Sequence, residues 1–226
     1  MQSFRRQAES NTMGWATMSE ESLIKSATAG DPVAFAGVVE IYQRPVYNLC
    51  YRMLGNSGEA EDAAQEAFLR AYAQRRSYDP TRSFKTWLLS IASHYCIDRL
   101  RKRRVQYLSI DDEPLQVHPA LRERRAGPED AALAQEQADR IQVLLAGLAP
   151  ENRNALVMRY WYDLSYEEIA AVTGASVSAI KSRLHRARLT LGEMLQPEVT
   201  SDSGRKDQRT AAASRLAPSA AVPMLA

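Results

Sequence analysis

The hydrophobic and polar positions of the chain follow a helical period along most of its length. Between residues 32 and 53, seven apolar side chains recur at steps of three and four, which places them on one face of a helix with 3.6 residues per turn. Gly30 precedes Asp31-Pro32, where a carboxylate caps a new helix and proline fits its first turn. The pattern therefore predicts helices over 19–29 and 32–53. The inward face of the second is expected to contain Phe35, Val38, Val39, Tyr42, Val46, Leu49 and Met53.

Two more helices are predicted before residue 105. The stretch Gly55-Asn56-Ser57-Gly58 interrupts the pattern, and a third helix is expected over 58–75. Pro80 disfavours a helical Asp79, so the residues around this pair are expected to form a loop. The fourth helix follows that loop. Its inward face is expected to contain Phe84, Leu88, Ile91 and Tyr95.

The stretch 105–128 contains three prolines, charges of both signs and no sustained period, so it is interpreted as an extended linker. Beyond it, helices are predicted over 129–147, 150–161, 166–173 and 177–195. These assignments predict an all-α fold of two small helical domains, joined by an extended linker and flanked by disordered tails. The expected divisions are a disordered segment at 1–18, a first domain at 19–105, a linker at 106–128, a second domain at 129–196 and a disordered tail at 197–226.

Composition limits the classes of function. The 226 residues are 45% hydrophobic, enough for one or two modest cores. The net charge is only +2, from 29 basic and 27 acidic residues, so any affinity for nucleic acid has to come from local clusters. Cys50 and Cys96 form no CxxC pair, which argues against a zinc site and a disulfide framework and favours a reduced, cytoplasmic setting.

Membrane insertion and catalysis are not expected. The first residues lack a continuous apolar segment, and no later run approaches the roughly 18 apolar residues of a membrane span. The histidines, His94, His118 and His185, are scattered, and no phosphate-binding glycine loop or nucleophile motif is present. We therefore expect a protein without enzymatic activity, cofactor or metal.

Residues 166–191 combine the features of a helix-turn-helix. Ser165 and Glu168 have the spacing of a capping box, and Gly174 lies in a short turn between two helices. Lys and Arg beside small hydroxyls suit a helix in a DNA major groove, although a basic face that is merely hydrated is the simpler alternative. The inward face of the last helix would contain Val177, Ile180, Leu184, Ala187 and Leu191. The face toward DNA would contain Ser178, Lys181, Ser182, His185 and Arg186. Arg183 and Arg188 lie between the two faces, where they suit contact with phosphates or carboxylates.

Two charged patterns lie in the first domain. Asp62, Gln65, Glu66 and Leu69 form an i, i+3, i+4, i+7 strip that suits docking on a basic partner helix. The simpler alternative is that carboxylates early in a helix support it through the helix dipole. The fourth helix ends in a basic block, part of which the dipole at a helix C-terminus explains without any partner. The block contains Arg99, Arg101, Lys102 and Arg103.

Four strings occur in the order AGDPVAF, AEDAAQEAFLRAY, FKTWLLSIASHYCIDRLRKRR, and LSYEEIA with IKSRLHRARLTL. In this order they resemble the extracytoplasmic-function sigma factors, compact bacterial relatives of sigma-70. The resemblance covers about 20–105 and 130–195 and implies a promoter-specificity subunit that helps melt DNA and directs initiation by RNA polymerase. A stand-alone helix-turn-helix regulator, with the first domain for dimerisation or sensing, is the alternative.

The resemblance also implies partners for particular residues. The DxxQE helix would bind the clamp helices of the largest polymerase subunit, through Asp62, Gln65, Glu66, Leu69 and Arg70. The loop from Tyr78 to Ser83, with Trp87, His94 and Asp98, would hold a base flipped from the −10 element, and Arg99, Arg101, Lys102 and Arg103 would clamp the DNA backbone. Lys181, Ser182, His185 and Arg186, with Ser178 beside them, would recognise the −35 element. The linker, with Asp111, Asp112 and Glu113, would run toward the RNA exit path, and an anti-sigma factor is implied as a further partner.

Overall fold

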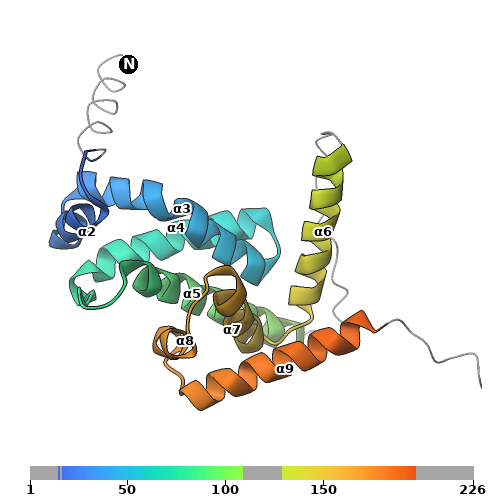
Figure 1. Cartoon of the computed structure of the whole chain (residues 1–226). Coiled ribbons are helices and arrows are strands. Elements are labelled where there is room, and N and C mark those ends of the chain that lie inside the picture. Colours follow the sequence, from blue (N-terminus) through green and yellow to red (C-terminus); the bar gives the residue numbers. More distant parts are fainter. Residues whose placement is uncertain (1–14, 16, 109–128, 197–226) are drawn as a thin grey trace, which may run out of the picture. The chain divides into compact units, whose positions relative to one another are not determined.

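The computed structural model describes residue 15, residues 17–108 and residues 129–196. The described residues are helical, and no β-strand occurs among them (Figure 1). The all-α class is therefore confirmed. The helices are α2 (Glu20–Ala29), α3 (Pro32–Leu54), α4 (Ser57–Gln74), the 3-10 turn η1 (Arg75–Ser77), α5 (Phe84–Leu108), α6 (Glu129–Ala146), α7 (Pro150–Trp161), α8 (Tyr166–Thr173) and α9 (Val177–Leu195).

Local chemistry sets the boundaries of the first helices. The Asp31 carboxylate accepts hydrogen bonds from the backbone N–H groups of Val33 (2.8 Å) and Ala34 (3.3 Å), as the sequence predicts for this cap. Gly30 and Gly55 end α2 and α3 with φ values of 111° and 78°, in the left-handed region that glycine adopts without strain. The breaks that separate α2, α3 and α4 are therefore set by the types of the residues at the helix ends.

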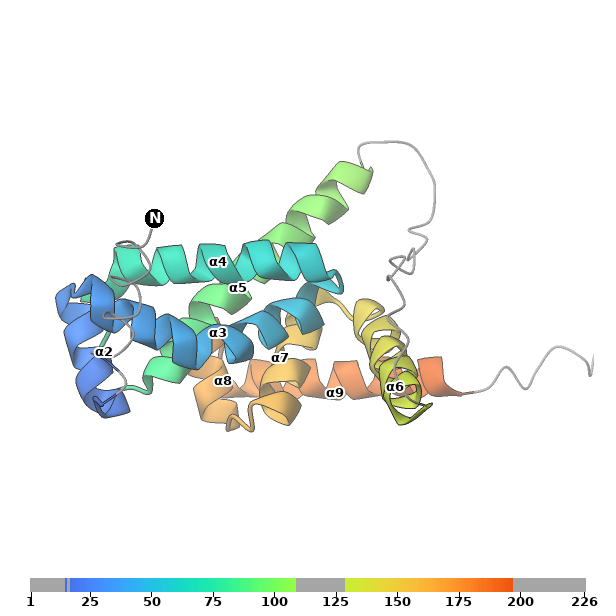
Figure 2. The same cartoon turned by 90° about the horizontal axis from the view of Figure 1, so that it is seen from above.

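Helices α2 to α5 pack around one apolar core, with α3 in contact with the other three and α4 alongside it (Figure 2). The predicted inward face of α3 is confirmed, because Val38, Val46, Leu49 and Met53 are fully buried. The predicted face of α5 is only partly confirmed. Phe84 and Leu88 are buried, whereas Ile91 and Tyr95 are half-buried against the core, and the most buried face is displaced toward Leu89, Ala92 and Cys96.

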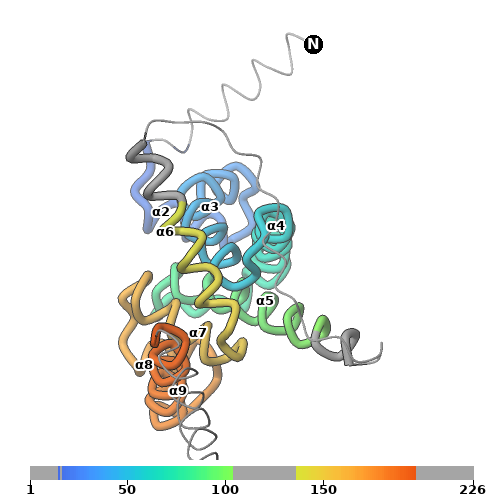
Figure 3. The backbone as a smooth tube through the Cα atoms, turned by 90° about the vertical axis from the view of Figure 1, so that its right-hand side faces the viewer, coloured from blue at the N-terminus to red at the C-terminus, as the bar shows by residue number. Residues whose placement is uncertain are grey.

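This displacement has a tertiary cause. Helix α5 contacts α3 and α4 on one side and α7 and α8 on the other, so it buries a wider arc than a single stripe (Figure 3). Its end also differs from the expected boundary at residue 105, because the helix continues to Leu108. No glycine or proline stands between the basic block and Pro114, so no residue in that interval forces the helix to end. Of the expected linker, residues 109–128 lie outside the described part, as does the expected tail at 197–226.

The expectation of disorder over 1–18 is wrong at its C-terminal end. Trp15 and Met18 pack against the core, and the Met18 N–H donates to the Trp15 carbonyl at 3.0 Å. Gly37 on α3 makes the room, because a Cβ there would lie 2.8 Å from the Trp15 indole. The packed N-terminal bundle therefore includes Trp15, although residues 1–14 and 16 lie outside the described part.

Arg153 on α7 joins the second set of helices to the first. Only 7% exposed, it donates through Nη2 to the carbonyls of Ala146 (2.7 Å) and Leu148 (3.3 Å). Its Nη1 donates to the Met53 carbonyl near the end of α3. Burial, together with the nearby Arg103, lowers the pKa of Arg153 to about 10. The guanidinium therefore satisfies helix-end carbonyls that otherwise lack partners.

Replacing Arg153 by alanine is expected to lower the free energy of unfolding by about 3 kcal/mol, because it removes three hydrogen bonds from a charged donor and leaves their acceptors unpaired. Urea unfolding followed by circular dichroism measures this change. Arg140→Ala on the exposed surface of α6 is the matched control, with an expected change within about 0.5 kcal/mol. Equal stability of the two variants would show that these hydrogen bonds contribute nothing net.

Candidate nucleic-acid interface

The polar strip of α4 is accessible. Asp62 and Gln65 are exposed, and the apolar side chain of Leu69 is 67% exposed beside them. Glu66 pairs with Arg70 at 2.7 Å, and the Arg70 guanidinium lies 4.8 Å from the centre of the Tyr95 ring. The buried side of α4 consists mainly of alanines with Phe68, so the exposed strip is free to contact a partner.

The loop between η1 and α5 is held by its own side chains. The Asp79 carboxylate accepts from the Thr81 N–H (3.0 Å) and the Thr81 hydroxyl (2.7 Å), and the Tyr78 hydroxyl donates to the Arg82 carbonyl at 2.7 Å. The hydrogen bonds from Thr81 and the charge of Arg82 lower the pKa of Asp79. The Ser83 hydroxyl accepts from the Thr86 N–H at 3.4 Å at the start of α5. The loop is thus ordered without a ligand.

Aromatic side chains gather behind this loop. Tyr78 and Trp87 rings are 5.3 Å apart, and both lie 5.2–5.3 Å from the Phe84 ring. Trp87 is half-buried against the core, so it has a packing role and also an accessible part. This arrangement suits Trp87 both for packing against the core and for contact with a base.

His94 and Asp98 lie one turn apart on the exposed surface of α5. The His94 Nδ1 is 2.7 Å from the Ser90 carbonyl, and because a carbonyl only accepts, this nitrogen carries the proton. The other ring nitrogen, Nε2, is then left for a ligand. Asp98 lies 3.9 Å from Arg101, a loose contact for an ion pair between exposed side chains.

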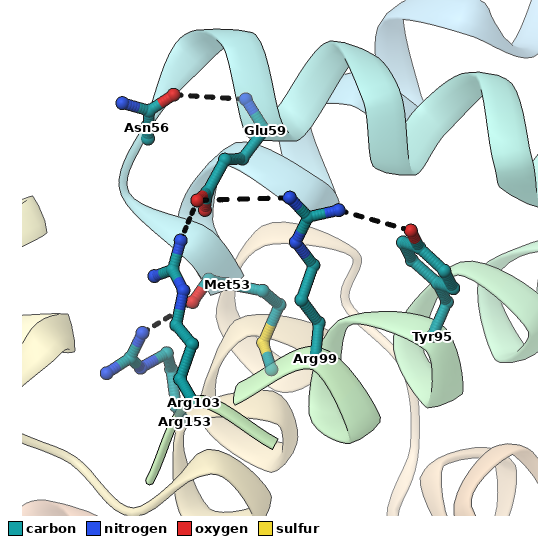
Figure 4. Close-up of polar contacts among 7 residues, drawn as sticks. All are labelled: Met53, Asn56, Glu59, Tyr95, Arg99, Arg103 and Arg153. Atoms are coloured by element: carbon teal, nitrogen blue, oxygen red, sulfur yellow. Dashed lines mark hydrogen bonds and ion pairs between the residues drawn. The ribbon is translucent and has the colours of Figure 1, made fainter. Parts of the chain in front are cut away.

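Part of the basic block lines a groove of about 400 Å³ on α4 and α5, hereafter the basic groove. Arg99 donates to the Tyr95 hydroxyl at 3.2 Å. The Glu59 carboxylate of α4 lies 3.9 Å from Arg99 Nη2 and pairs with Arg103 (Figure 4). Four of the lining side chains are cationic, so the groove suits an anion such as a nucleic-acid phosphate. Its lining residues are Arg70, Tyr95, Asp98, Arg99, Lys102 and Arg103.

Arg101 does not line this groove. It pairs with Glu151 at the start of α7, with Arg101 Nη2 and Nε lying 2.6 and 3.0 Å from Glu151 Oε1. Burial, the largest single cause, would raise the pKa of Glu151. The hydrogen bond and charge of Arg101, a backbone N–H hydrogen bond and the charge of Arg183 together outweigh it, so the pKa lies below its ordinary value. The four basic residues expected to act together are therefore divided, with Arg99, Lys102 and Arg103 in the groove and Arg101 outside it.

The helix-turn-helix motif has the local structure that its sequence predicts. The Ser165 hydroxyl accepts from the Glu168 N–H at 3.1 Å, and the Glu168 carboxylate accepts from the Ser165 N–H at 2.8 Å, which completes the capping box. Gly174 ends α8 in the left-handed region, with φ 62°. The inward positions of α9 are buried or half-buried: Val177, Ile180, Leu184, Ala187 and Leu191.

The opposite side of α9 is accessible. Ser178, Lys181, Ser182, His185 and Arg186 are all exposed, and the Ser182 hydroxyl donates to the Ser178 carbonyl of its own helix at 3.1 Å. Arg183 is half-buried, whereas Arg188 is exposed. All five residues expected to contact DNA thus share one surface of α9.

Two residues of α4 belong to this interface although the sequence does not place them there. Glu59 pairs with the arginines of α5, and Arg70, expected to contact polymerase, also lines the basic groove. Both contacts join α4 to α5. No short-range sequence pattern encodes the pairing of two helices, so this signal was absent.

Comparison with known proteins agrees with these features. Residues 38–105 match the family described as Sigma-70 region 2, and residues 138–191 match Sigma-70, region 4. The ECF RNA polymerase sigma factor SigW of Bacillus subtilis is 40% identical over 177 residues, which cover 76% of this chain and 95% of the relative. This chain belongs to the ECF sigma factors of the sigma-70 family. The ECF RNA polymerase sigma-E factor of Escherichia coli K12 is 31% identical over 185 residues, 80% of this chain and 96% of the relative.

Two solved structures have a fold similar to that of this chain. RpoE of Bartonella quintana, solved in complex with the anti-sigma factor NepR, is 25% identical with a TM-score of 0.52, over 73% of this ECF sigma factor and 98% of that chain. CnrH, solved with the cytosolic domain of CnrY, has a TM-score of 0.57 at 24% identity, over 78% and 96% of the two chains, and shows likeness of fold alone.

Two further properties of the described part of this ECF sigma factor concern membrane spans and metal sites. None of the helices in the described ranges is long and apolar enough to cross a membrane. Within the same ranges, no three His, Cys, Asp or Glu side chains gather in a way that would hold a metal ion.

Proposed function

We propose that this ECF sigma factor binds core RNA polymerase through α4 and promoter DNA through α5 and α9, and so directs the start of transcription. The observation that carries the proposal is the exposed strip of Asp62, Gln65, Glu66 and Leu69 on α4, beside the basic groove. Carboxylates around an exposed leucine suit a basic helical partner, for which we propose the clamp helices of the largest polymerase subunit.

At the −10 element, the proposed mechanism is capture of a base from a strand that is already breathing. Opening DNA costs on the order of 1 to 2 kcal/mol per base-pair step, and extruding a base costs a few kcal/mol more. The loop from Tyr78 to Ser83, with Trp87 and His94 beside it, is already positioned to contact that base. The basic groove neutralises the adjacent phosphates. Polymerase supplies the remaining contacts.

At the −35 element, the exposed surface of α9 enters the major groove. Lys181 and Arg186 provide donors for guanine edges or phosphates, and Ser178, Ser182 and His185 permit close approach of the helix. The buried Ile180 and Leu184 fix the rotation of α9, so these five side chains face the DNA together.

Further partners follow from family membership. B. quintana RpoE was solved with an anti-sigma factor, and we propose that this sigma factor is also regulated by such a protein. The surfaces of this sigma factor are suited to binding, and its sequence contains no catalytic cluster, so we propose that it acts without enzymatic activity of its own. We also propose that it acts in the cytoplasm. The acidic residues Asp111, Asp112 and Glu113 lie outside the described part, and their proposed place is near the RNA exit path.

Run-off transcription with purified core polymerase on a promoter library tests the proposal. The sigma factor should direct initiation at a subset of templates that share −35 and −10 sequences, and should bind those templates only weakly, in a salt-sensitive manner, when polymerase is absent. Tight sequence-specific binding without polymerase, combined with no initiation on any template, would instead favour a stand-alone regulator.

A further inference from the structure

The Glu59 carboxylate is placed among the cations of the basic groove by the fold. Glu59 lies in the first turn of α4, where the helix dipole favours a negative charge, and its N–H donates to the Asn56 side chain at 3.0 Å. Its side chain is only 25% exposed, and one oxygen, Oε1, faces both Arg99 and Arg103 (Figure 4). The other oxygen, Oε2, is buried without a hydrogen-bond partner.

A carboxylate and a DNA phosphate bind a guanidinium group in the same way, because each accepts hydrogen bonds from its N–H groups through an anionic oxygen. The Nη2 groups of Arg99 and Arg103 are directed at Glu59, so its negative charge offsets part of the positive charge that these arginines offer to a phosphate. Lys102 lines the same groove and has no carboxylate partner among the described residues. The groove is therefore partly neutralised by the protein itself.

We infer that Glu59 is an internal counter-anion that weakens the hold of Arg99 and Arg103 on DNA of any sequence. The inference rests on the proposed function of the basic groove, which is to bind DNA phosphates. It adds that Glu59, which does not itself line the groove, regulates the strength of that binding. Non-specific binding arises almost entirely from phosphate neutralisation, so masking two arginines weakens binding to DNA of any sequence. Attachment of the free protein to DNA away from promoters is therefore limited.

Glu59→Gln in the full chain tests this inference, because glutamine keeps the shape and removes the charge. Binding to a fluorescent 30-base-pair duplex of random sequence, without polymerase, is measured by anisotropy at several salt concentrations. We expect roughly three- to tenfold tighter binding, with a log–log salt slope steeper by about 0.9 for each phosphate gained. Unchanged or weaker binding overturns the inference, and weaker binding would show that Glu59 instead orients the arginines for DNA.

Two controls separate the ion pairs from net charge. Glu61→Gln changes the charge by the same amount on the same helix, and Glu61 is exposed. It should alter binding by less than about twofold. In a background with Arg99→Gln and Arg103→Gln, adding Glu59→Gln should have no further effect. An equal gain in affinity with and without the two arginines overturns the inference. Thermal unfolding verifies that each variant is folded.

Run-off transcription with the same proteins distinguishes failure of this inference from failure of the proposed function. With core polymerase, Glu59→Gln should leave the ratio of promoter to non-promoter transcripts unchanged within about twofold, because phosphate contacts carry no sequence information. If the wild-type protein initiates but Glu59→Gln leaves duplex affinity unchanged, only the role of Glu59 is overturned. If Glu59→Gln tightens duplex binding and the wild-type protein never initiates, the proposed function fails and the counter-anion is supported.

Discussion

Glu66→Lys is expected to lower the affinity of the sigma factor for core polymerase at least about tenfold, which corresponds to roughly 1.4 kcal/mol. Glu66 is 37% exposed in the middle of the strip on α4 and pairs with Arg70. Lysine would place a like charge beside Arg70 and oppose a basic partner helix, so both attraction to polymerase and local order are lost. Asp62→Ala combined with Gln65→Ala should act in the same direction.

A titration of labelled sigma factor with core enzyme measures the effect of Glu66→Lys. Glu40→Lys is a matched control, because Glu40 is exposed on α3 and its replacement changes the net charge equally. Circular dichroism should give the same helix content for both variants. If Glu66→Lys binds polymerase as well as Glu40→Lys does, α4 is not the polymerase contact.

Lys181→Ala and Arg186→Ala are each expected to weaken recognition of the −35 element by roughly 1 to 3 kcal/mol, if the side chain makes a bidentate contact with a base. Both side chains are exposed on the surface of α9 opposite the buried Ile180 and Leu184, so their removal should leave the fold unchanged. Competition between templates with intact and scrambled −35 sequences, bound by holoenzyme, measures the loss of discrimination.

Arg188→Ala provides the comparison for these two variants. Arg188 is exposed but lies nearer the packed side of α9, where contact with a phosphate is expected rather than with a base. Its loss should weaken binding to intact and scrambled templates alike. If Lys181→Ala and Arg186→Ala behave in the same uniform way, these side chains contact phosphates only.

The helices could be predicted from sequence because their boundaries depend on neighbouring residues. Asp31 with Pro32, Gly55, the Ser165–Glu168 pair and Gly174 each act over less than two turns, and all lie at the ends where their chemistry predicts them. Family membership could be predicted because four sequence strings, in their order, resemble those of the ECF sigma factors. The strip on α4 and the basic surface of α9 could be predicted because each lies within one helix. Both surfaces are exposed, as their spacing requires.

The sequence by itself therefore determined the helices, the family and the surfaces that lie on single helices. Only the tertiary structure decided that α5 buries Leu89 and Ala92 more fully than Ile91 and Tyr95, that Gly37 accommodates Trp15, and that Glu59 meets Arg99 and Arg103. It also decided that Arg101 pairs with Glu151, fifty residues away. These features depend on which helices pack together. The shape and charge of residues far apart in the sequence decide that packing, so the spacing of residues within one helix does not predict it.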